Sequence, residues 1–239
     1  MLKDKIESAC SILSDADKIS KQGFKFILFS GGKDSIVVSH LARKMLGIQN
    51  AFNEDSCVPP YLKDEVKGIG DSLGLNVYYN TRLNPKNFVQ HWKNQIPPKK
   101  WKPSDLDCIR HWLSIPEYAK RTSATMMIFG RRKQENTIPK PIYYKKNFKP
   151  LQVHPIWNWT WEDVWEYIEL NNLQTPSCYR DGSKHLLTWV SLAQKCFKET
   201  NSMKKTYDVI YKHAPEYVKE MAKHDEMVNE YVKSKDGNI

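Results

Sequence analysis

Six consecutive residues have the side chains and the spacing that bind a phosphate group. They follow a short apolar run, residues 24–29, and precede residues 36–46, whose apolar side chains recur at helical spacing. Two adjacent glycines let a ligand approach the main chain, and the start of a helix offers free N–H groups and the positive end of its dipole. A lysine and two serines add charge and hydrogen-bond donors. We therefore predict an anion site formed by Ser30, Gly31, Gly32, Lys33, Asp34 and Ser35.

The spacing of this loop differs from that of the two common nucleotide-binding loops. A Walker loop ends in Gly-Lys-Ser or Gly-Lys-Thr after four intervening residues, and a dinucleotide fingerprint requires G-x-G-x-x-G. Neither spacing occurs in residues 30–35. An ordinary glycine turn between a strand and a helix is the alternative interpretation, but the agreement of strand, turn, cation and helix favours a phosphate loop.

A second polar group follows another apolar strand. Residues 125–129 lead into Gly130, Arg131 and Arg132. An arginine is a planar, permanently charged donor that binds phosphate or sulfate through two N–H groups. Because ligands bind at the carboxyl ends of parallel strands, we expect these residues at the same sheet edge as the loop. The alternative is a solvated run of positive charge.

Two aspartates are candidate ligands of Mg²⁺. Asp34 lies in the phosphate loop, and Asp55 lies in the acidic turn 53–56 after an expected strand, residues 48–52. Carboxylates and substrate phosphates are the ligands that Mg²⁺ prefers. Glu54 or Asp55 could instead bind a ribose hydroxyl, and the turn could equally be a capping cluster.

The elements that must position these residues alternate along the chain. Strands are expected at 24–29, 48–52, 75–79 and 125–129, and helices at 2–20, 36–46 and 61–73. This alternation predicts an α/β fold with a doubly wound, mostly parallel sheet. A hairpin is expected at 142–144 and 149–153, followed by a helix whose capping box joins Thr160 and Asp163. We assign residues 1–200 to the nucleotide-binding domain and residues 201–239 to a C-terminal helical tail.

Composition favours an anionic partner in a reducing compartment. The 239 residues carry a net charge of +10, which is spread along the chain and so does not indicate nucleic acid in particular. The five cysteines form no C-x-x-C pair, so no zinc ribbon or local redox pair is written in the sequence. No secretory signal and no membrane-spanning run are found, and we expect a cytoplasmic location without a membrane partner.

Four motifs in order resemble the phosphoadenosine phosphosulfate (PAPS) reductase family of the adenine nucleotide alpha-hydrolase, or PP-loop, superfamily, which also contains the small subunit of ATP sulfurylase. They are the SGGKDS loop, the acidic turn before Pro59-Pro60, the strand end FGRRKQEN, and the block that begins PIWNWTWEDVW. The resemblance implies a Rossmann-like fold that binds ATP, PAPS or adenosine phosphosulfate (APS). It implies that residues 30–35 hold nucleotide phosphates, and that Arg131 and Arg132, next to Gly130, hold the sulfate or the outer phosphates. It also implies catalytic roles for Lys33, Asp34, Arg131 and Arg132.

The same resemblance leaves the reaction open. The Glu-Cys-Gly-Leu-His motif with which the reductases attack their substrate does not occur in these residues, nor do the cysteine pairs of an iron–sulfur cluster, so no cluster is expected. The complete loop favours ATP-dependent adenylyl transfer to sulfate, a flavin nucleotide or a nucleic-acid base. The alternatives are a sulfonucleotide reductase or sulfurtransferase using Cys57, Cys178 or Cys196, and a non-catalytic nucleotide-sensing subunit. A partner subunit and a homodimer both stay open.

Overall fold

The computed structural model describes residues 1–20, 22–54, 60–80, 115–134, 140–145, 148–180, 208, 211–212, 215–223 and 226–237. The chain divides into two compact units. One comprises Met1–Asn53, Val66–Tyr79 and Leu113–Thr175, and the other comprises Glu54–Glu65, Asn80–Trp112 and Pro176–Ile239. The expected boundary at residue 200 falls outside the described residues and stays a prediction.

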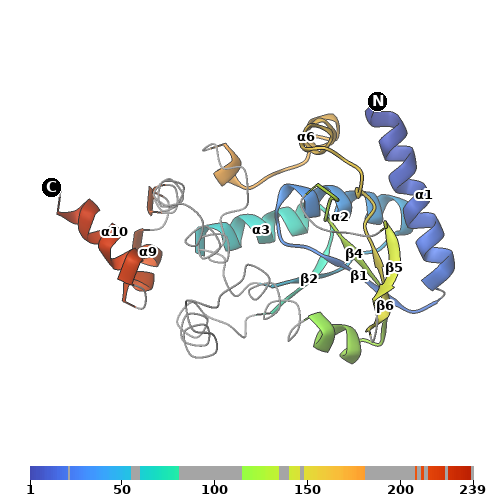
Figure 1. Cartoon of the computed structure of the whole chain (residues 1–239), viewed down its shortest axis with the longest axis horizontal. Coiled ribbons are helices and arrows are strands. Elements are labelled where there is room, and N and C mark those ends of the chain that lie inside the picture. Colours follow the sequence, from blue (N-terminus) through green and yellow to red (C-terminus); the bar gives the residue numbers. More distant parts are fainter. Residues whose placement is uncertain are drawn as a thin grey trace. The chain divides into compact units, whose positions relative to one another are not determined.

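The first unit is built on a six-stranded sheet (Figure 1). Its strands are β1 (Phe24–Leu28), β2 (Asn50–Asn53), β3 (Asn76–Tyr79), β4 (Ala124–Phe129), β5 (Ile142–Lys145) and β6 (Phe148–Val153). They lie in the order β3-β2-β1-β4-β6-β5, and every pair is parallel except β5 with β6. The mostly parallel α/β sheet and the hairpin are thereby confirmed. The sequence did not indicate that β6 would also extend the sheet beside β4.

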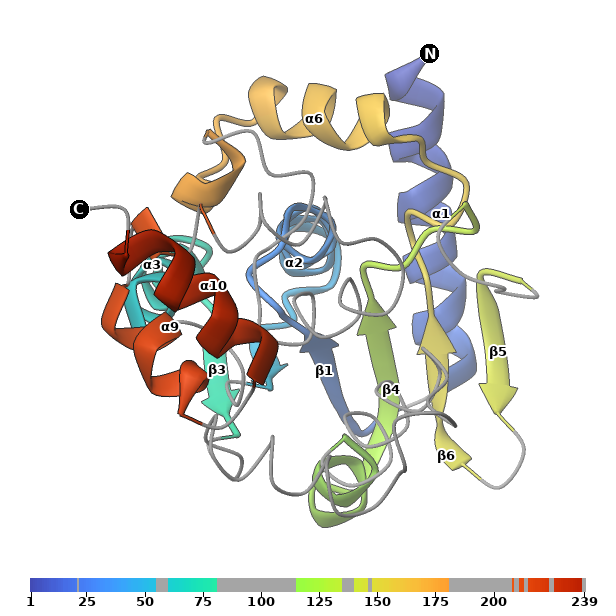
Figure 2. The ribbon, with the colours of Figure 1, turned by 60° about the vertical axis from the view of Figure 1, so that its left-hand side comes forward.

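Four of the described helices pack on one face of this sheet. They are α1 (Leu2–Ser20), α2 (Lys33–Leu46), α3 (Pro60–Ser72) from Val66 onward, and α6 (Trp161–Leu170). Figure 2 shows α6 running above α2 and reaching α1 at one end, and all three helices contact one another. A further helix, residues 115–121, contributes Ile115, Tyr118 and Ala119 to a separate aromatic cluster.

The strand β1 and the residue that follows it show why both faces are covered. Ile27 and Phe29 belong to the large core under α1 and α2, whereas Phe26 belongs to the aromatic cluster. Successive side chains of a strand point to opposite faces, so a run that is apolar at nearly every position indicates cover on both. Apart from Lys25, the apolar run of residues 24–29 therefore matches a strand that is covered on both faces.

The start of α6 is defined by a capping box, as predicted. Thr160 accepts a hydrogen bond from the Asp163 N–H, and the Asp163 carboxylate accepts one from the Thr160 N–H. Just before the cap, Trp159 is fully buried, and its indole N–H donates to the Lys5 carbonyl at 3.3 Å. The tryptophan-rich block is thus a packing centre that joins α6 to α1.

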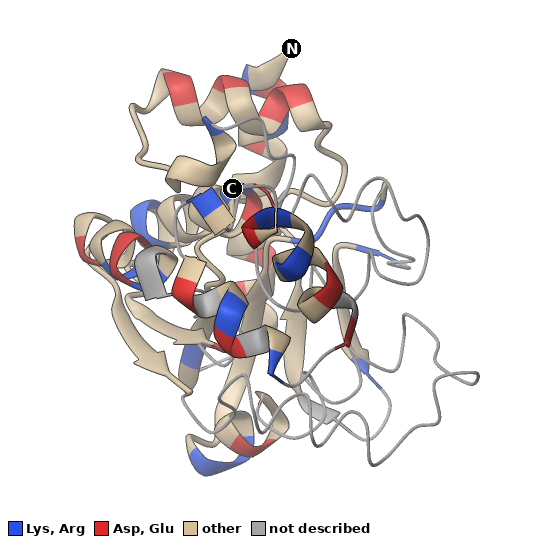
Figure 3. Ribbon diagram, turned by 90° about the vertical axis from the view of Figure 1, so that its left-hand side faces the viewer, with Lys and Arg blue, Asp and Glu red and all other residues tan. Residues whose placement is uncertain are grey.

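The described part of the second unit includes η3 (Ser177–Tyr179), α9 (Pro215–Ala222) and α10 (Glu226–Asp236). The two helices α9 and α10 pack on each other with Val218, Val228 and Tyr231 buried. Their outer surfaces carry both signs of charge, visible beside the C-terminal end in Figure 3, as in the Lys219–Asp236 and Lys223–Glu220 ion pairs. Among the described residues, no helix has the length and apolarity needed to cross a bilayer.

The helix after the phosphate loop begins earlier than expected. The sequence indicated a start at Ile36, but α2 starts at Lys33, and the Ile36 N–H donates to the Gly32 carbonyl at 3.0 Å. Apolar periodicity cannot mark a first turn whose side chains are polar. Lys33, Asp34 and Ser35 are therefore helical residues, and the turn itself is only Ser30, Gly31 and Gly32.

Gly31 is the conformationally demanding residue of this turn. Its φ is +77°, and an added Cβ would lie 2.4 Å from Cγ2 of Val66 on α3. We expect Gly31→Ala to lower the free energy of unfolding by more than about 1 kcal/mol, because strain and overlap combine. Gly32→Ala is the matched control: Gly32 has an ordinary φ of −76°, so a loss of only a few tenths of a kcal/mol is expected. Equal stability losses in urea titrations would contradict this assignment.

Candidate functional site

The site lies where the chain order of the sheet reverses. From β1 the chain proceeds to β2 and β3 on one side, and then returns to β4 on the other side of β1. Leu28 of β1 is in register with Phe129 of β4. The segments 30–35 and 130–132 therefore emerge next to each other, as the sequence predicted. In open α/β sheets, this switch point is where ligands bind.

The turn holds its own shape through hydroxyl groups. The Ser30 hydroxyl donates to Ser35 Oγ at 3.1 Å and accepts from the Gly32 N–H at 3.2 Å. The Ser35 hydroxyl donates to the Gly32 carbonyl at 2.8 Å. Both serines were expected to bind phosphate directly. In the structure they tie the turn to the first turn of α2, which fixes the direction of the helix N-terminus.

Three charged side chains meet at this helix N-terminus, and we call Lys33, Asp34 and Arg132 the ion triad. Lys33 Nζ lies 2.5 Å from Asp34 Oδ2, and Arg132 Nε donates to Asp34 Oδ1 at 2.8 Å. The Lys33 and Arg132 side chains are 2% and 3% exposed, and the Asp34 side chain is 18% exposed. One carboxylate thus bridges two buried cations that come from different strand ends.

Gly130 allows this meeting by packing closely rather than by offering a donor. A Cβ on Gly130 would lie 2.7 Å from the Asp34 carbonyl group and from Ser35 N. The end of β4 therefore passes directly against the first turn of α2. Any larger residue would push the two segments apart and separate Arg132 from Asp34.

Trp161 completes the surroundings of Lys33 and was not proposed as a site residue from the sequence. Lys33 Nζ lies 4.2 Å from the centroid of the Trp161 ring. A cation over an indole face is attracted by the negative face of the ring. The only sequence signal was the position of Trp161 as the first residue after the α6 cap, which does not reveal that this end of α6 reaches α2.

Arg131 and Arg132 take different directions although they are neighbours. The Arg131 guanidinium lies 5.3 Å over the Phe129 ring, and Phe129 stacks on His154, which stacks in turn on Tyr143. The sequence predicted that both arginines hold one anion. The structure places Arg132 in the ion triad and Arg131 over this aromatic stack, so a ligand role for Arg131 stays a prediction.

Comparison with known proteins identifies the family of the chain. The family model of the phosphoadenosine phosphosulfate reductase domain matches residues 25–210. The chain belongs to this family. An uncharacterized protein from Methanocaldococcus jannaschii is 27% identical over 66% of this chain, and the match covers 39% of that protein. The adenosine 5′-phosphosulfate reductase of Staphylococcus saprophyticus is 26% identical over 47% of this chain and 46% of its own length. The chain thus matches less than half the length of these two relatives.

A solved structure shares the fold. The PAPS reductase of Candida auris, crystallised as a phosphate complex, superimposes with a TM-score of 0.56 over 76% of this chain and 88% of its own, at 16% sequence identity. This likeness establishes the Rossmann-like architecture of the PAPS reductase domain.

The described residues of this PAPS reductase domain offer a poor site for Mg²⁺. Both Asp34 oxygens accept from cations, and a divalent ion beside two cations is opposed by their charge. No group of three or more His, Cys, Asp or Glu residues in the described part of the chain is spaced to hold a metal. Glu54 accepts from the Asn80 amide at 3.0 Å, and Asp55 lies outside the described residues. Neither Asp34 nor Glu54 is therefore assigned as a metal ligand.

The cysteines proposed as nucleophiles are only partly described. Cys178 is fully buried in η3, whose Ser177 donates to the Glu65 carboxylate through its N–H and its hydroxyl, both at 2.6 Å. Cys57 and Cys196 lie outside the described residues. The buried sulfur of Cys178 is not accessible, so this thiol is unsuited to attack a ligand in this conformation.

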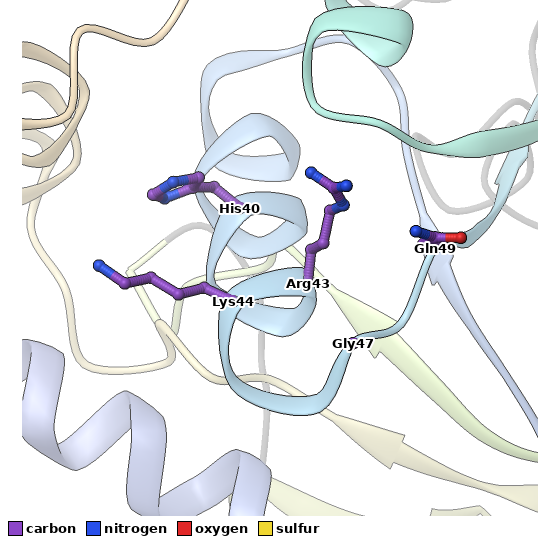
Figure 4. A pocket seen from close by; sticks show the side chains of 5 residues that line it. All are labelled: His40, Arg43, Lys44, Gly47 and Gln49. Atoms are coloured by element: carbon purple, nitrogen blue, oxygen red, sulfur yellow. The ribbon is translucent and has the colours of Figure 1, made fainter.

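A basic hollow at the other end of α2 is separate from the site. It has a volume of about 380 Å³ and is lined by His40, Arg43, Lys44, Gly47 and Gln49. In Figure 4, His40 and Lys44 point to one side of α2 and Arg43 points to the other. Their charges do not converge, so this hollow offers no second anion site. His40, the lining residue nearest to the ion triad along α2, follows Lys33 by seven residues, which is about 10 Å along the helix axis.

His154 follows β6 at the same sheet edge and is buried, and neither ring nitrogen has a hydrogen-bond partner in the described part of the chain. Burial, with a smaller contribution from Arg131, lowers its pKa from 6.5 to about 3. The ring is therefore neutral in the folded protein, while in the unfolded chain it takes up a proton below pH 6.5.

We expect the free energy of unfolding to fall by up to about 1.4 kcal/mol per pH unit as the pH drops from 6.5 toward 3. In His154→Phe this component should vanish while stability at pH 7 is kept. Identical pH slopes of the two proteins in urea titrations would contradict the burial of a neutral imidazole.

Proposed function

We propose that this chain is an enzyme that binds ATP through residues 30–35 and transfers its adenylyl group to a second substrate. The supporting observation is the convergence of Lys33 and Arg132 on the N-terminus of α2 at the switch point of the sheet. Two cations and a helix N-terminus match the several negative charges of a triphosphate better than the single charge of a carboxylate substrate.

The proposed step forms one bond and breaks one. An oxygen of the second substrate attacks the α-phosphorus of ATP, the bond to the bridging oxygen breaks, and pyrophosphate leaves with the electron pair. Lys33 stabilises the charge that develops on the leaving pyrophosphate, since its ammonium is already held in place. Arg132 binds the same leaving pyrophosphate. In the proposed reaction, Mg²⁺ is the ion bound to ATP and is not held by these residues. Sulfate, a flavin nucleotide and a nucleic-acid base are the candidate acceptors.

A sulfonucleotide reductase is the second candidate, because several relatives carry the name adenosine 5′-phosphosulfate reductase. The same phosphate loop would bind APS or PAPS, but a thiolate must then reach the sulfur atom. The complete loop with Lys33 favours triphosphate chemistry, and the buried Cys178 offers no accessible thiolate. A nucleotide-sensing subunit without activity is the third candidate.

Product analysis separates the three candidates. We expect ATP with the correct acceptor to yield pyrophosphate, and we expect this release to survive replacement of all five cysteines by Ala or Ser but to fail in Lys33→Ala. Thioredoxin-dependent release of sulfite from APS or PAPS, lost in the cysteine-free protein, would establish the reductase instead. Binding of ATP without either product would indicate a sensing subunit.

Affinity measurements test the role of Arg132. Arg132→Ala should weaken ATP binding by about 1.5–3 kcal/mol, the value of a hydrogen bond to a charged group, and Arg132→Lys should restore only part of it because lysine lacks the planar fork. Arg121→Ala is the matched control, since Arg121 lies over Tyr78 and Tyr118 before β4 begins. Calorimetry that shows equal affinity for wild type and Arg132→Ala would remove Arg132 from the site.

A further inference from the structure

The carboxylate of Asp34 lies between the two cations of the ion triad. Its two oxygens contact two separate cations, Lys33 Nζ at 2.5 Å and Arg132 Nε at 2.8 Å. Asp34 also lies in the first turn of α2, where the helix dipole favours negative charge. Lysine, arginine and helix N-terminus are the three donors that recognise phosphate or sulfate, and here one side chain of the protein contacts both cations.

The geometry of the carboxylate resembles that of the expected ligand. A sulfate or a phosphate presents pairs of oxygens on one central atom, as a carboxylate does on its carbon. A group that bridges Lys33 and Arg132 through two such oxygens could therefore replace Asp34 without moving either cation. Both cations are held from other directions as well, since Trp161 lies against Lys33 and Gly130 keeps the segment of Arg132 close to α2.

The charges favour this exchange. Within the ion triad, two cations face one carboxylate. A doubly charged oxyanion would bring more negative charge to Lys33 and Arg132 than the single charge of Asp34 does. Asp34 is also the most exposed member of the triad, with 18% of its side chain open to solvent, so it is the group that can turn outward.

We propose that Asp34 is an internal counter-ion whose place between Lys33 and Arg132 is taken by a phosphate or sulfate group of the ligand. This inference rests on the proposed function only in locating the ligand at residues 30–35. It gives Asp34 a role opposite in sign to that of a magnesium ligand. A counter-ion competes with the anion, so its removal strengthens anion binding, whereas removal of a metal ligand weakens the binding of Mg²⁺-ATP.

The sign is tested with Asp34→Asn, which keeps the shape of the side chain and removes its charge. The probes are sodium sulfate, against sodium chloride of equal ionic strength, and ATP in the presence of EDTA. We expect the variant to bind both anions roughly tenfold more tightly than wild type by calorimetry, which corresponds to about 1.4 kcal/mol. Its unfolding temperature should be lower than that of wild type in chloride and should rise more steeply with sulfate.

Two control variants accompany the test. Asp17→Asn removes a carboxylate that pairs with Lys25 away from the site, and its response to sulfate should equal that of wild type. This comparison subtracts the general stabilisation of folded proteins by sulfate. Asp34→Glu keeps a carboxylate near both cations and should show an anion affinity close to that of wild type. If Asp34→Asn fails to fold in chloride, recovery of the folded state in sulfate supports the proposal, and failure in both salts overturns it.

The outcomes separate this inference from the proposed function. Unchanged or weaker anion binding by Asp34→Asn, with ATP still bound by wild type, overturns the counter-ion role and leaves ATP binding intact. A loss of affinity confined to solutions with MgCl₂ would establish Asp34 as a metal ligand. A stronger sulfate response of the variant, with no ATP binding by either protein, would support the counter-ion and overturn the choice of nucleotide.

Discussion

Two buried cations share one carboxylate at the N-terminus of α2, and this arrangement constrains much of the surrounding structure. A charge removed from water costs several kcal/mol unless it is paired with good geometry. Lys33 and Arg132 are almost fully buried, and Asp34 reaches both. The pairing requires that the ends of β1 and β4 lie side by side, that Gly130 pack against the α2 backbone, and that Gly31 turn the chain with a positive φ. A change in any of these three conditions would separate the charges.

The cluster also explains how a family fold can acquire a particular chemistry. The PAPS reductase domain supplies the sheet, the switch point and the helix N-terminus, and a fold at this level is compatible with several reactions. The residues that face the switch point set the reaction. In this chain they include Trp161, the first residue of α6. Its ring covers Lys33, so the start of α6 is part of the candidate site.

The neighbouring aromatic stack has a different physical character. Phe129, His154 and Tyr143 form a stack of rings, and Arg131 lies over Phe129 at one end of it. The buried His154 ring has no hydrogen-bond partner among the described residues, and the rings on its two faces hold it in place. Adjacent residues at the end of one strand, Arg131 and Arg132, therefore serve two environments, one apolar and one ionic.

The sequence by itself determined the elements and the edge at which the site lies. Nearly continuous apolar runs identified β1 and β4 as buried strands, the glycine pair identified the turn, and Thr160 with Asp163 identified the start of α6. These signals are local, because burial, backbone freedom and capping are recorded in adjacent residues. Tertiary structure alone decided that Asp34 pairs with Arg132, that Arg131 turns away, and that Trp161 covers Lys33. The two contacts join segments that are far apart in the sequence; Asp34 and Arg132, for example, are 98 residues apart. No spacing within the chain records where two such segments meet.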